Sequence, residues 1–377
     1  MPKILRKYCI GACKKLRQIL TNPFKIRIFK GFVFVIMIEK IDVLDHIRSR
    51  PGMYIGALDH SGVNEIVYYL IQNFIATEFY EISFTLEKNN RVIIESRSSK
   101  SSTFISDAIK NISDCKNAHF HLSIATLIAL SDSLTIEIND FPVLNSHKGI
   151  FKIENEIIDA AGKMRFAFII DKEIFKELSL SYLHLNTVLR RFAFLNSKLK
   201  IKSIDESSDE LQINVFHYPH GLSEITDFEL VKNFRYDSPF FKLKFDKKTD
   251  FSYSISLAFV GGWSLKPKIK VYANYKQTIL GGSLLDGILQ GFKKFLKEMT
   301  LKNNLKLNIS NKKLKNHLLL YASVNGELSF LGSTRWKLGT PEVQSEIKEF
   351  VCQELISYFA DKDNELSDVL DILQNNY

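Results

Sequence analysis

Apolar residues recur with helical spacing between Gly62 and Glu78. They stand three and four residues apart, which predicts a helix with one buried face, and they are Val63, Ile66, Val67, Leu70, Ile71, Phe74 and Ile75. The more polar face of the same helix carries Glu65, Tyr69, Gln72, Asn73 and Ala76. We therefore expect this helix to pack on a core and to present a second, chemically distinct face.

Alternating apolar and polar positions predict strands on both sides of a turn at Asn89-Asn90. Ile82, Phe84 and Leu86 alternate before the turn, and an apolar run at 92–94 follows it, which predicts a hairpin. A helix around 121–130 then leads into a strand at 134–138. Helices and strands in this order predict an α+β sandwich, with helices on one face of a mixed sheet.

A second sheet-and-helix unit is predicted from residue 229 onward. Strand alternation recurs at 253–259 and 269–273, and Gly281-Gly282 precedes a long helical pattern. Thr340-Pro341 predicts the start of another helix, with the Thr340 hydroxyl as N-cap and Pro341 at the first helical position. The sequence contains no internal repeat and no low-complexity linker. The pattern thus predicts two αβ units behind an N-terminal extension.

Basic charge is concentrated in the extension. The chain has 51 Lys and Arg against 42 Asp and Glu, and nine of the basic residues but no acidic residue fall within 1–36. The rest of the chain is balanced, so its overall charge does not predict nucleic-acid binding. A length of 377 residues with 45% hydrophobic content suits two folded domains with cores.

Residues 1–36 have the pattern of a basic amphipathic helix. Three interpretations stay open: an arm that contacts a membrane surface or nucleic acid, an organelle transit peptide, or an unordered extension, even an untranslated one upstream of Met37. The absence of serine up to residue 36 weakens the transit-peptide interpretation. The apolar stretch 31–38 is much shorter than the roughly 20 residues of a membrane-spanning helix.

The cysteines predict a reducing compartment and no disulfide scaffold, because there are only four and they are widely spread: Cys9, Cys13, Cys115 and Cys352. Cys115 precedes His119 and His121, which would allow a metal ion. No second ligand pair has a familiar zinc spacing, so we favour structural roles for these residues.

Six short motifs occur in one order along the chain, and together they resemble the gyrase B and topoisomerase IV ParE family of type IIA topoisomerase B subunits. The motifs are RPGMYIG at 50–56, ALS at 129–131, RRFAFLNSKLKI at 190–201, FHYPHG at 216–221, GGSLLDG at 281–287 and KLGTPEV at 337–343. The resemblance implies a GHKL-type ATPase domain at 39–228 and a transducer resembling ribosomal protein S5 domain 2 at 229–377, after an extension at 1–38. The nuclease-religase module that follows in full-length B subunits is not expected within these residues.

The resemblance also indicates which residues stand at the ATPase positions. GHKL proteins place a Glu base and a magnesium-binding Asn four residues apart on one helix, and here Tyr69 matches the Glu while Asn73 matches the Asn. A phenol with a pKa near 10 is a poor general base at neutral pH. Glu65 is a weak substitute candidate, since it lies about 5 Å further along the helix axis. Hydrolysis is therefore predicted to be lost, with no catalytic residue intact.

Other nucleotide contacts of the family are altered as well. Ser96 matches the adenine-binding Asp, although a shift of one residue would place Glu95 there. Residues 118–123, AHFHLS, match the phosphate lid GLHGVG without the glycines that free its backbone amides.

The transducer keeps part of a phosphate contact by the same resemblance. Ser333, Thr334 and Arg335 match a Gln-Thr-Lys motif that reaches the γ-phosphate, and Lys337 matches a second lysine. Arg335 retains a cation that can bind phosphate, although both cations could equally lie on a solvated loop.

Two functions from different classes are compatible with these matches to the family's motifs. We favour a non-hydrolysing relative that acts as a dimerisation or regulatory module, as a homodimer or paired with a B subunit; the alternative is an active ATP-hydrolysing subunit of a type IIA topoisomerase. The resemblance implies ATP and magnesium as cofactors, with Asn73 as a metal ligand only if ATP binds, and a topoisomerase A subunit and DNA as partners. It also implies a location in the cytoplasm, where the protein could associate with the nucleoid. The alternative is an organelle, if residues 1–36 are a transit peptide. Any contact with a membrane surface would involve residues 1–36 alone.

Overall fold

The computed structural model describes residues 24–29, 32–37, 43–102, 118–155, 160–176, 178–233, 239–261, 268–302, 309–332 and 335–374. The chain divides into two compact units, each taken here by itself. The first contains 1–73, 101–160 and 167–179, and the second contains 74–100, 161–166 and 180–377. The domain boundaries expected at residues 38 and 228 stay predictions.

The first unit contains the helix predicted from Gly62 to Glu78, which runs two residues earlier as α4, His60–Ala76. Asp59 precedes it and accepts hydrogen bonds from the Ser61 backbone N–H and hydroxyl, at 2.8 and 2.6 Å. These bonds lower the pKa of the Asp59 carboxyl. Glu78 has φ +62°, a left-handed conformation that ends the helix.

The other elements of the first unit include the predicted helix and strand, with α6 leading directly into β5. They are α2 (Val43–Ser49), α3 (Gly52–Ile55), α6 (Ala118–Leu130), β5 (Ser131–Ile138), β6 (Phe141–His147), β7 (Ile150–Ile153) and α7 (Lys172–Phe175). Residues 24–37 correct one expectation, because they form an antiparallel pair, β1 (Phe24–Phe29) with β2 (Phe32–Met37), and not the end of a helix. The helical stripe expected at 4–20 lies outside the described residues.

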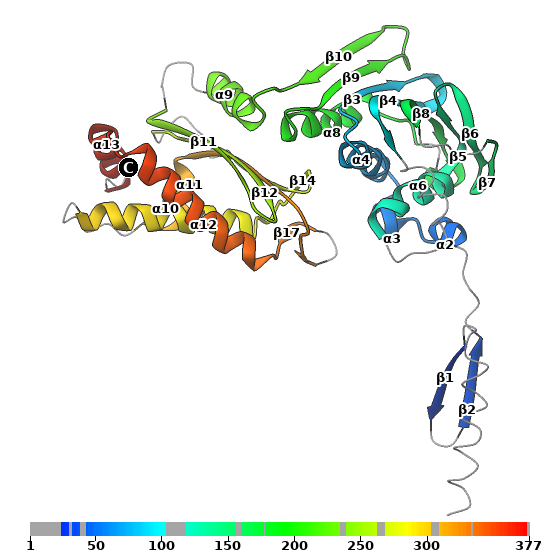
Figure 1. The fold of residues 1–377 in the computed structure, drawn as a ribbon, viewed down its shortest axis with the longest axis horizontal. Helices are drawn as coiled ribbons and strands as arrows, with labels where there is room; N and C mark the ends of the chain where they lie inside the picture. The colour runs from blue at the N-terminus through cyan, green and yellow to red at the C-terminus, as the bar shows by residue number, and fades with distance from the viewer. Residues whose placement is uncertain are drawn as a thin grey trace, which may run out of the picture. The chain divides into compact units, whose positions relative to one another are not determined.

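A mixed eight-stranded sheet has the order β10-β9-β3-β4-β8-β5-β6-β7 (Figure 1). The strands not yet given are β3 (Glu81–Leu86), β4 (Arg91–Ser102), β8 (Ala160–Ile170), β9 (Lys200–Asp205) and β10 (Gln212–His217). The predicted hairpin is confirmed: β3 pairs antiparallel with β4, across the turn η1 (Lys88–Asn90) in which Asn89 and Asn90 have positive φ. On its other side β3 runs parallel to β9. The expected α+β class with a mixed sheet is therefore confirmed.

The second unit also contains a five-stranded sheet of order β11-β12-β15-β13-β14, in which β13 and β15 are parallel. Its strands are β11 (Phe241–Lys248), β12 (Ser252–Phe259), β13 (Lys268–Ala273), β14 (Lys276–Gln277) and β15 (Leu318–Asn325). A short hairpin pairs β16 (Phe330–Leu331) with β17 (Lys337–Leu338). The helices of this unit are α8 (Tyr182–Leu195), α9 (Leu222–Asn233), α10 (Ser283–Lys302), α11 (Asn311–Asn316), α12 (Pro341–Tyr358) and α13 (Asp363–Gln374). Among the described residues no helix is long and apolar enough to cross a membrane.

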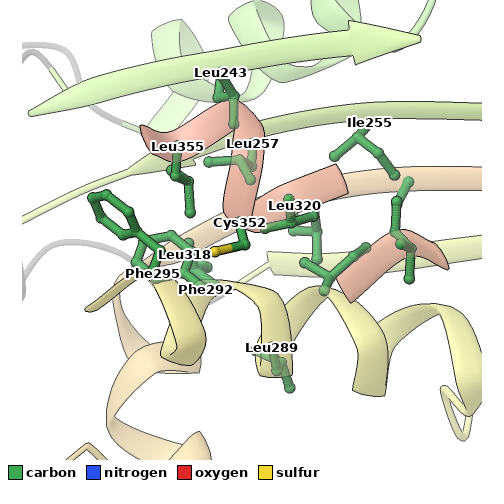
Figure 2. Packing of buried hydrophobic residues seen from close by; sticks show 14 of the residues in the cluster. Leu243, Ile255, Leu257, Leu289, Phe292, Phe295, Leu318, Leu320, Cys352 and Leu355 are labelled. Carbon is green, nitrogen blue, oxygen red and sulfur yellow. The ribbon is translucent and has the colours of Figure 1, made fainter. Parts of the chain in front are cut away.

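Side chains from α10, α12 and the five-stranded sheet interlock in one core (Figure 2). Phe292 and Phe295 of α10 are fully buried there, beside Leu355 of α12. Gly291 lets the two helices approach closely, because a Cβ built on it would lie 2.5 Å from the Lys348 carbonyl oxygen. Burial of large aromatic side chains at this density supplies most of the stabilising free energy of such a layer.

Helix α12 begins at Pro341 as predicted, but the role expected for the Thr340 hydroxyl is wrong. Thr340 makes no side-chain cap on the helix. Its hydroxyl accepts a hydrogen bond from the Ser329 backbone N–H at 2.9 Å instead. The Thr340 side chain thus stabilises the hairpin that precedes α12 and does not cap the first turn of the helix.

Candidate functional site

Helix α4 presents the three residues that the family resemblance places around the reactive end of a nucleotide. Glu65, Tyr69 and Asn73 stand four residues apart, so their side chains leave the helix on one side. Asn73 is buried at 5% exposure, whereas Glu65 and Tyr69 are half-buried. The face therefore offers one amide, one phenol and one carboxylate, with the phenol in the middle.

Tyr69 is tied to the RPGMYIG segment. Its hydroxyl donates a hydrogen bond to the backbone carbonyl of Tyr54, at 3.3 Å. The Tyr54 hydroxyl in turn lies 2.6 Å from Nδ1 of His46 in α2. The side chain at the expected base position thus acts as a hydrogen-bond donor that links α4 to α3.

Asn73 is tied to the segment that matches the phosphate lid. Its amide nitrogen donates a short hydrogen bond to the Ser123 hydroxyl, and both residues are buried. The segment itself is helical, because α6 already begins at Ala118. The first four backbone N–H groups of a helix have no intrahelical partner, so the lid segment differs from an open loop in having helical backbone geometry, and only its last residues bond their N–H groups within the helix.

Arg48, just before the RPGMYIG motif, contacts the ALS motif, and the sequence did not single it out. Its guanidinium donates to the carbonyl of Ala129, in the ALS segment, at 2.6 Å and pairs with Asp171 at 2.7 Å. The Asp171 side chain is 1% exposed and also accepts a hydrogen bond from the Glu173 N–H, at the start of α7. The only signal for Arg48 was its position two residues before RPGMYIG. A carboxylate buried this deeply requires a paired cation.

Ser96, at the adenine position, is buried in β4. Its hydroxyl donates to the carbonyl of Glu81 in β3 at 2.8 Å. Glu95, which a shift of one residue would bring to the same role, accepts ion pairs from Lys163 at 3.0 Å and Arg165 at 3.3 Å. Both acceptor candidates are engaged with neighbouring strands of the sheet.

The described part of the transducer motif consists of Arg335 and Lys337, since Ser333 and Thr334 lie outside the described residues. Arg335 has φ +57°, and its guanidinium lies 5.8 Å from the centre of the Phe330 ring. Lys337 is exposed on β17. Arg335 precedes β17 and Lys337 lies on it, while their role in phosphate binding stays a prediction.

Comparison with known proteins agrees with this arrangement. A family model described as DNA gyrase B matches residues 221–377. The B subunit of DNA gyrase from Clostridium acetobutylicum is 25% identical over 356 residues, which cover 85% of this chain and 55% of that protein. The B subunit of DNA topoisomerase 4 from Bacillus subtilis is 24% identical over 373 residues, covering 88% and 55%. The chain is a type IIA topoisomerase B-subunit-like protein.

Solved structures show the same fold. The B-subunit of the DNA gyrase from Myxococcus xanthus superposes with a TM-score of 0.70 at 16% identity, covering 84% of this chain and 96% of that one. The 43K ATPase domain of Thermus thermophilus gyrase B gives 0.69 at 20% identity, covering 89% and 94%. The GHKL-type fold expected for this B-subunit-like protein is thus confirmed. The chain spans about half the length of the relatives it matches.

The described side chains place no carboxylate at the base position of a magnesium–ATP site of the family kind. The donors at the expected positions are bonded to protein atoms, Tyr69 to Tyr54 and Asn73 to Ser123. No cluster of three or more His, Cys, Asp or Glu that could hold a metal is found within the described ranges. Of the cysteine and histidine cluster, Cys115 and the side chains of His119 and His121 lie outside them. The arrangement supplies hydrogen-bonded structure and no carboxylate at the base position.

Proposed function

We propose that this B-subunit-like protein is a non-hydrolysing relative that acts as a dimerisation or regulatory module, pairing with itself or with an active B subunit. The contact between Tyr69 and the Tyr54 carbonyl carries the proposal. A base must accept a proton from water, and a neutral phenol that already donates to a carbonyl is oriented for the opposite task. The proposal builds on the similarity of the chain to gyrase B-like ATPase domains.

The hydrogen bond between Asn73 and Ser123 supports the same proposal. A magnesium ion requires oxygen ligands in near-octahedral geometry, so Asn73 would have to present its amide oxygen to the ion. Its amide nitrogen is bonded to Ser123, which stands where the GLHGVG lid has its last glycine, so a lid of that type would lack this bond. The hydroxyl therefore holds α4 and α6 together at the point where a nucleotide phosphate would be expected.

The scaffold, in contrast, keeps the buried apolar cores that folding requires. The eight-stranded sheet, the five-stranded sheet and the α10–α12 layer all form with buried apolar cores. Proteins named as subunits of gyrase and topoisomerase 4 are the relatives, which supports assembly with a similar subunit. We further propose that a topoisomerase A subunit and DNA are reached through that partner and that the protein acts in the cytoplasm.

The decisive experiment measures ATP turnover and oligomeric state of the purified full chain. We expect no magnesium-dependent turnover above a protein-free blank, and the same result for Glu65→Ala. Turnover in the wild type that Glu65→Ala abolishes would overturn the proposal and establish Glu65 as a base.

Size-exclusion chromatography with light scattering tests the pairing. We expect a homodimer, or co-elution with a B subunit, that does not depend on a non-hydrolysable ATP analogue. A dimer that forms only with the analogue would favour the active-subunit alternative. A chain that stays monomeric alone and with B subunits would contradict the module proposed here.

A further inference from the structure

One face of the eight-stranded sheet carries a hollow of about 320 Å³ within the second unit. Strand pairing aligns its side chains in two rows. Glu81 lies opposite Lys200 on one side and Arg97 on the other. The second row has Ser83 between Lys202 and Glu95, and residues directly opposite one another in a ladder share a face.

The hollow is on the opposite side of β4 from the Ser96 side chain. Along β3 and β9 the residues of the hollow alternate with fully buried ones, such as Ile82 and Ile201. Successive side chains of a strand point to opposite faces of the sheet. Ser96 and Ile82 therefore contribute backbone atoms to the floor of the hollow, and their side chains point to the other face. The site is therefore distinct from the position at which the family resemblance places adenine.

Cations dominate the hollow. Lys163 lines the hollow and shares the carboxylate of Glu95 with Arg165, which lies behind that carboxylate on the same strand as Lys163. Arg97, Lys200 and Lys202 are exposed and have no ion-pair partner among the described residues. Four cationic groups thus line the hollow with two carboxylates, in a chain whose residues 37–377 carry equal numbers of both charges. The local excess is not a consequence of general basicity.

The spacing of the exposed cations indicates the ligand. Lys200 and Lys202 are two residues apart on one strand, about 7 Å, and Arg97 lies two strands from Lys200, about 10 Å. That area is wider than a single sulfate or phosphate and suits two or three linked phosphate groups. Arg and Lys both bind phosphate oxygens through charge-assisted hydrogen bonds, and the hollow has the volume of an ordinary small-ligand site.

We propose that this hollow binds anions with adjacent phosphate groups, either free, as in inorganic triphosphate, or in the backbone of a single-stranded nucleic acid. Arg97, Lys200 and Lys202 are the primary contacts. Lys163 and Arg165, held by Glu95, supply the positive potential at the edge. The proposal does not depend on whether the protein hydrolyses ATP.

Calorimetric titration of the full chain with inorganic triphosphate and, separately, with a thymidine oligonucleotide tests the proposal, in EDTA so that no metal contributes. We expect triphosphate to bind at least about tenfold more tightly than sulfate. The double variant Lys200→Gln/Lys202→Gln should weaken binding by about tenfold or more. For the oligonucleotide the slope of log affinity against log salt should fall by about 1.4.

The matched control is Lys242→Gln/Lys244→Gln, which removes two exposed lysines with the same spacing from β11. It should change the affinity for triphosphate by less than about twofold. Glu81→Gln should instead strengthen binding by about threefold, an effect that partial unfolding cannot produce. Circular dichroism melting curves confirm that each variant is folded.

Three results would overturn the proposal: no binding of either ligand up to about 1 mM, equal losses in the two double variants, or binding that Lys200→Gln/Lys202→Gln leaves unchanged. Binding of triphosphate alone would assign the hollow to a free anion. Binding of the oligonucleotide alone would assign it to a nucleic-acid backbone. Mutual displacement of the two ligands would show that both sources use the same cations.

Discussion

The α10–α12 layer and the α4–α6 contact have the same kind of helical framework but different chemical content. In the layer, aromatic and aliphatic side chains fill the space between helices and sheet, with Gly291 at the closest approach. In the contact, the residues expected to handle a nucleotide bond to one another and to backbone instead. The proposed function accounts for the difference: packing is kept in the layer while polar contacts are exchanged at the α4–α6 contact, because an apolar core tolerates no polar substitute whereas a polar site accepts several.

The largest expected effect comes from removing an aromatic side chain of the layer. Phe292→Ala empties a fully buried position and should lower the free energy of unfolding by about 3–5 kcal/mol. Urea titration followed by circular dichroism measures the loss. Phe141→Ala, at a position 69% exposed, is the control and should cost less than about 0.5 kcal/mol. Equal losses would mean that the layer is not the stabilising core.

The second prediction uses the closest contact between α10 and α12. Alanine normally stabilises a helix relative to glycine by about 1 kcal/mol, but at Gly291 the added Cβ would collide with the Lys348 carbonyl oxygen. Gly291→Ala should therefore destabilise the protein by about 1–3 kcal/mol. Gly52→Ala, where no atom lies within 4 Å of the added Cβ, should not. A stabilised Gly291→Ala variant would show that the helices are farther apart than described.

Alkaline pH tests whether Tyr272, which lies in a second hydrophobic cluster, is buried as firmly as the side chains of the α10–α12 layer. Burial raises the pKa of Tyr272 to about 12, with Arg191 opposing the shift. The unfolded chain then ionises near pH 10 while the folded chain stays neutral, so stability is complete below pH 10 and falls as pH rises toward 12. At about pH 11 the loss from this residue should approach 1.4 kcal/mol.

The variant Tyr272→Phe isolates that contribution, because it removes the ionisable group and keeps most of the buried ring. Its unfolding free energy should decline less than that of the wild type between pH 10 and 12, measured by urea titration at each pH. Parallel decline of the two proteins would indicate that Tyr272 is accessible to solvent in the folded state.

Local periodicity was sufficient to predict α4, the β3–β4 hairpin and several further helices and strands, but contacts between distant residues were not visible in it. The apolar spacing of α4 and the alternation in β3 report burial directly, so both were predicted within two residues. The pairing of Arg48 with Asp171 joins positions 123 residues apart, and the hollow exists only because of the register between β3, β4 and β9. The Thr340 hydroxyl was misassigned for the same reason, since Ser329 competes with the helix for it.

The motif positions of the site were predicted from the resemblance, whereas their contacts required the fold. Tyr69 and Asn73 were assigned to the base and metal-ligand positions from the resemblance, because they stand four residues apart as the family's Glu and Asn do. That Ser123 would accept from Asn73 depends on α6 being helical from Ala118, which the altered lid sequence did not indicate. Polar partners are exchanged easily between neighbouring side chains, so sequence patterns constrain them less than they constrain a core.

The smallest expected effect decides between two explanations of the site. Ser123→Ala removes the hydroxyl that accepts from buried Asn73, which should cost about 1 kcal/mol in urea titration and leave nucleotide affinity unchanged, measured with a fluorescent ATP analogue. Ser345→Ala, in which an exposed helical hydroxyl donates to the Pro341 carbonyl, is the matched control and should be nearly neutral. If the serine merely closed a working pocket, Ser123→Ala would raise nucleotide affinity by about tenfold or more. The hydrogen bond between Asn73 and Ser123 would then keep an intact nucleotide site closed, and the site would differ from the α10–α12 layer in conformation and not in lost function.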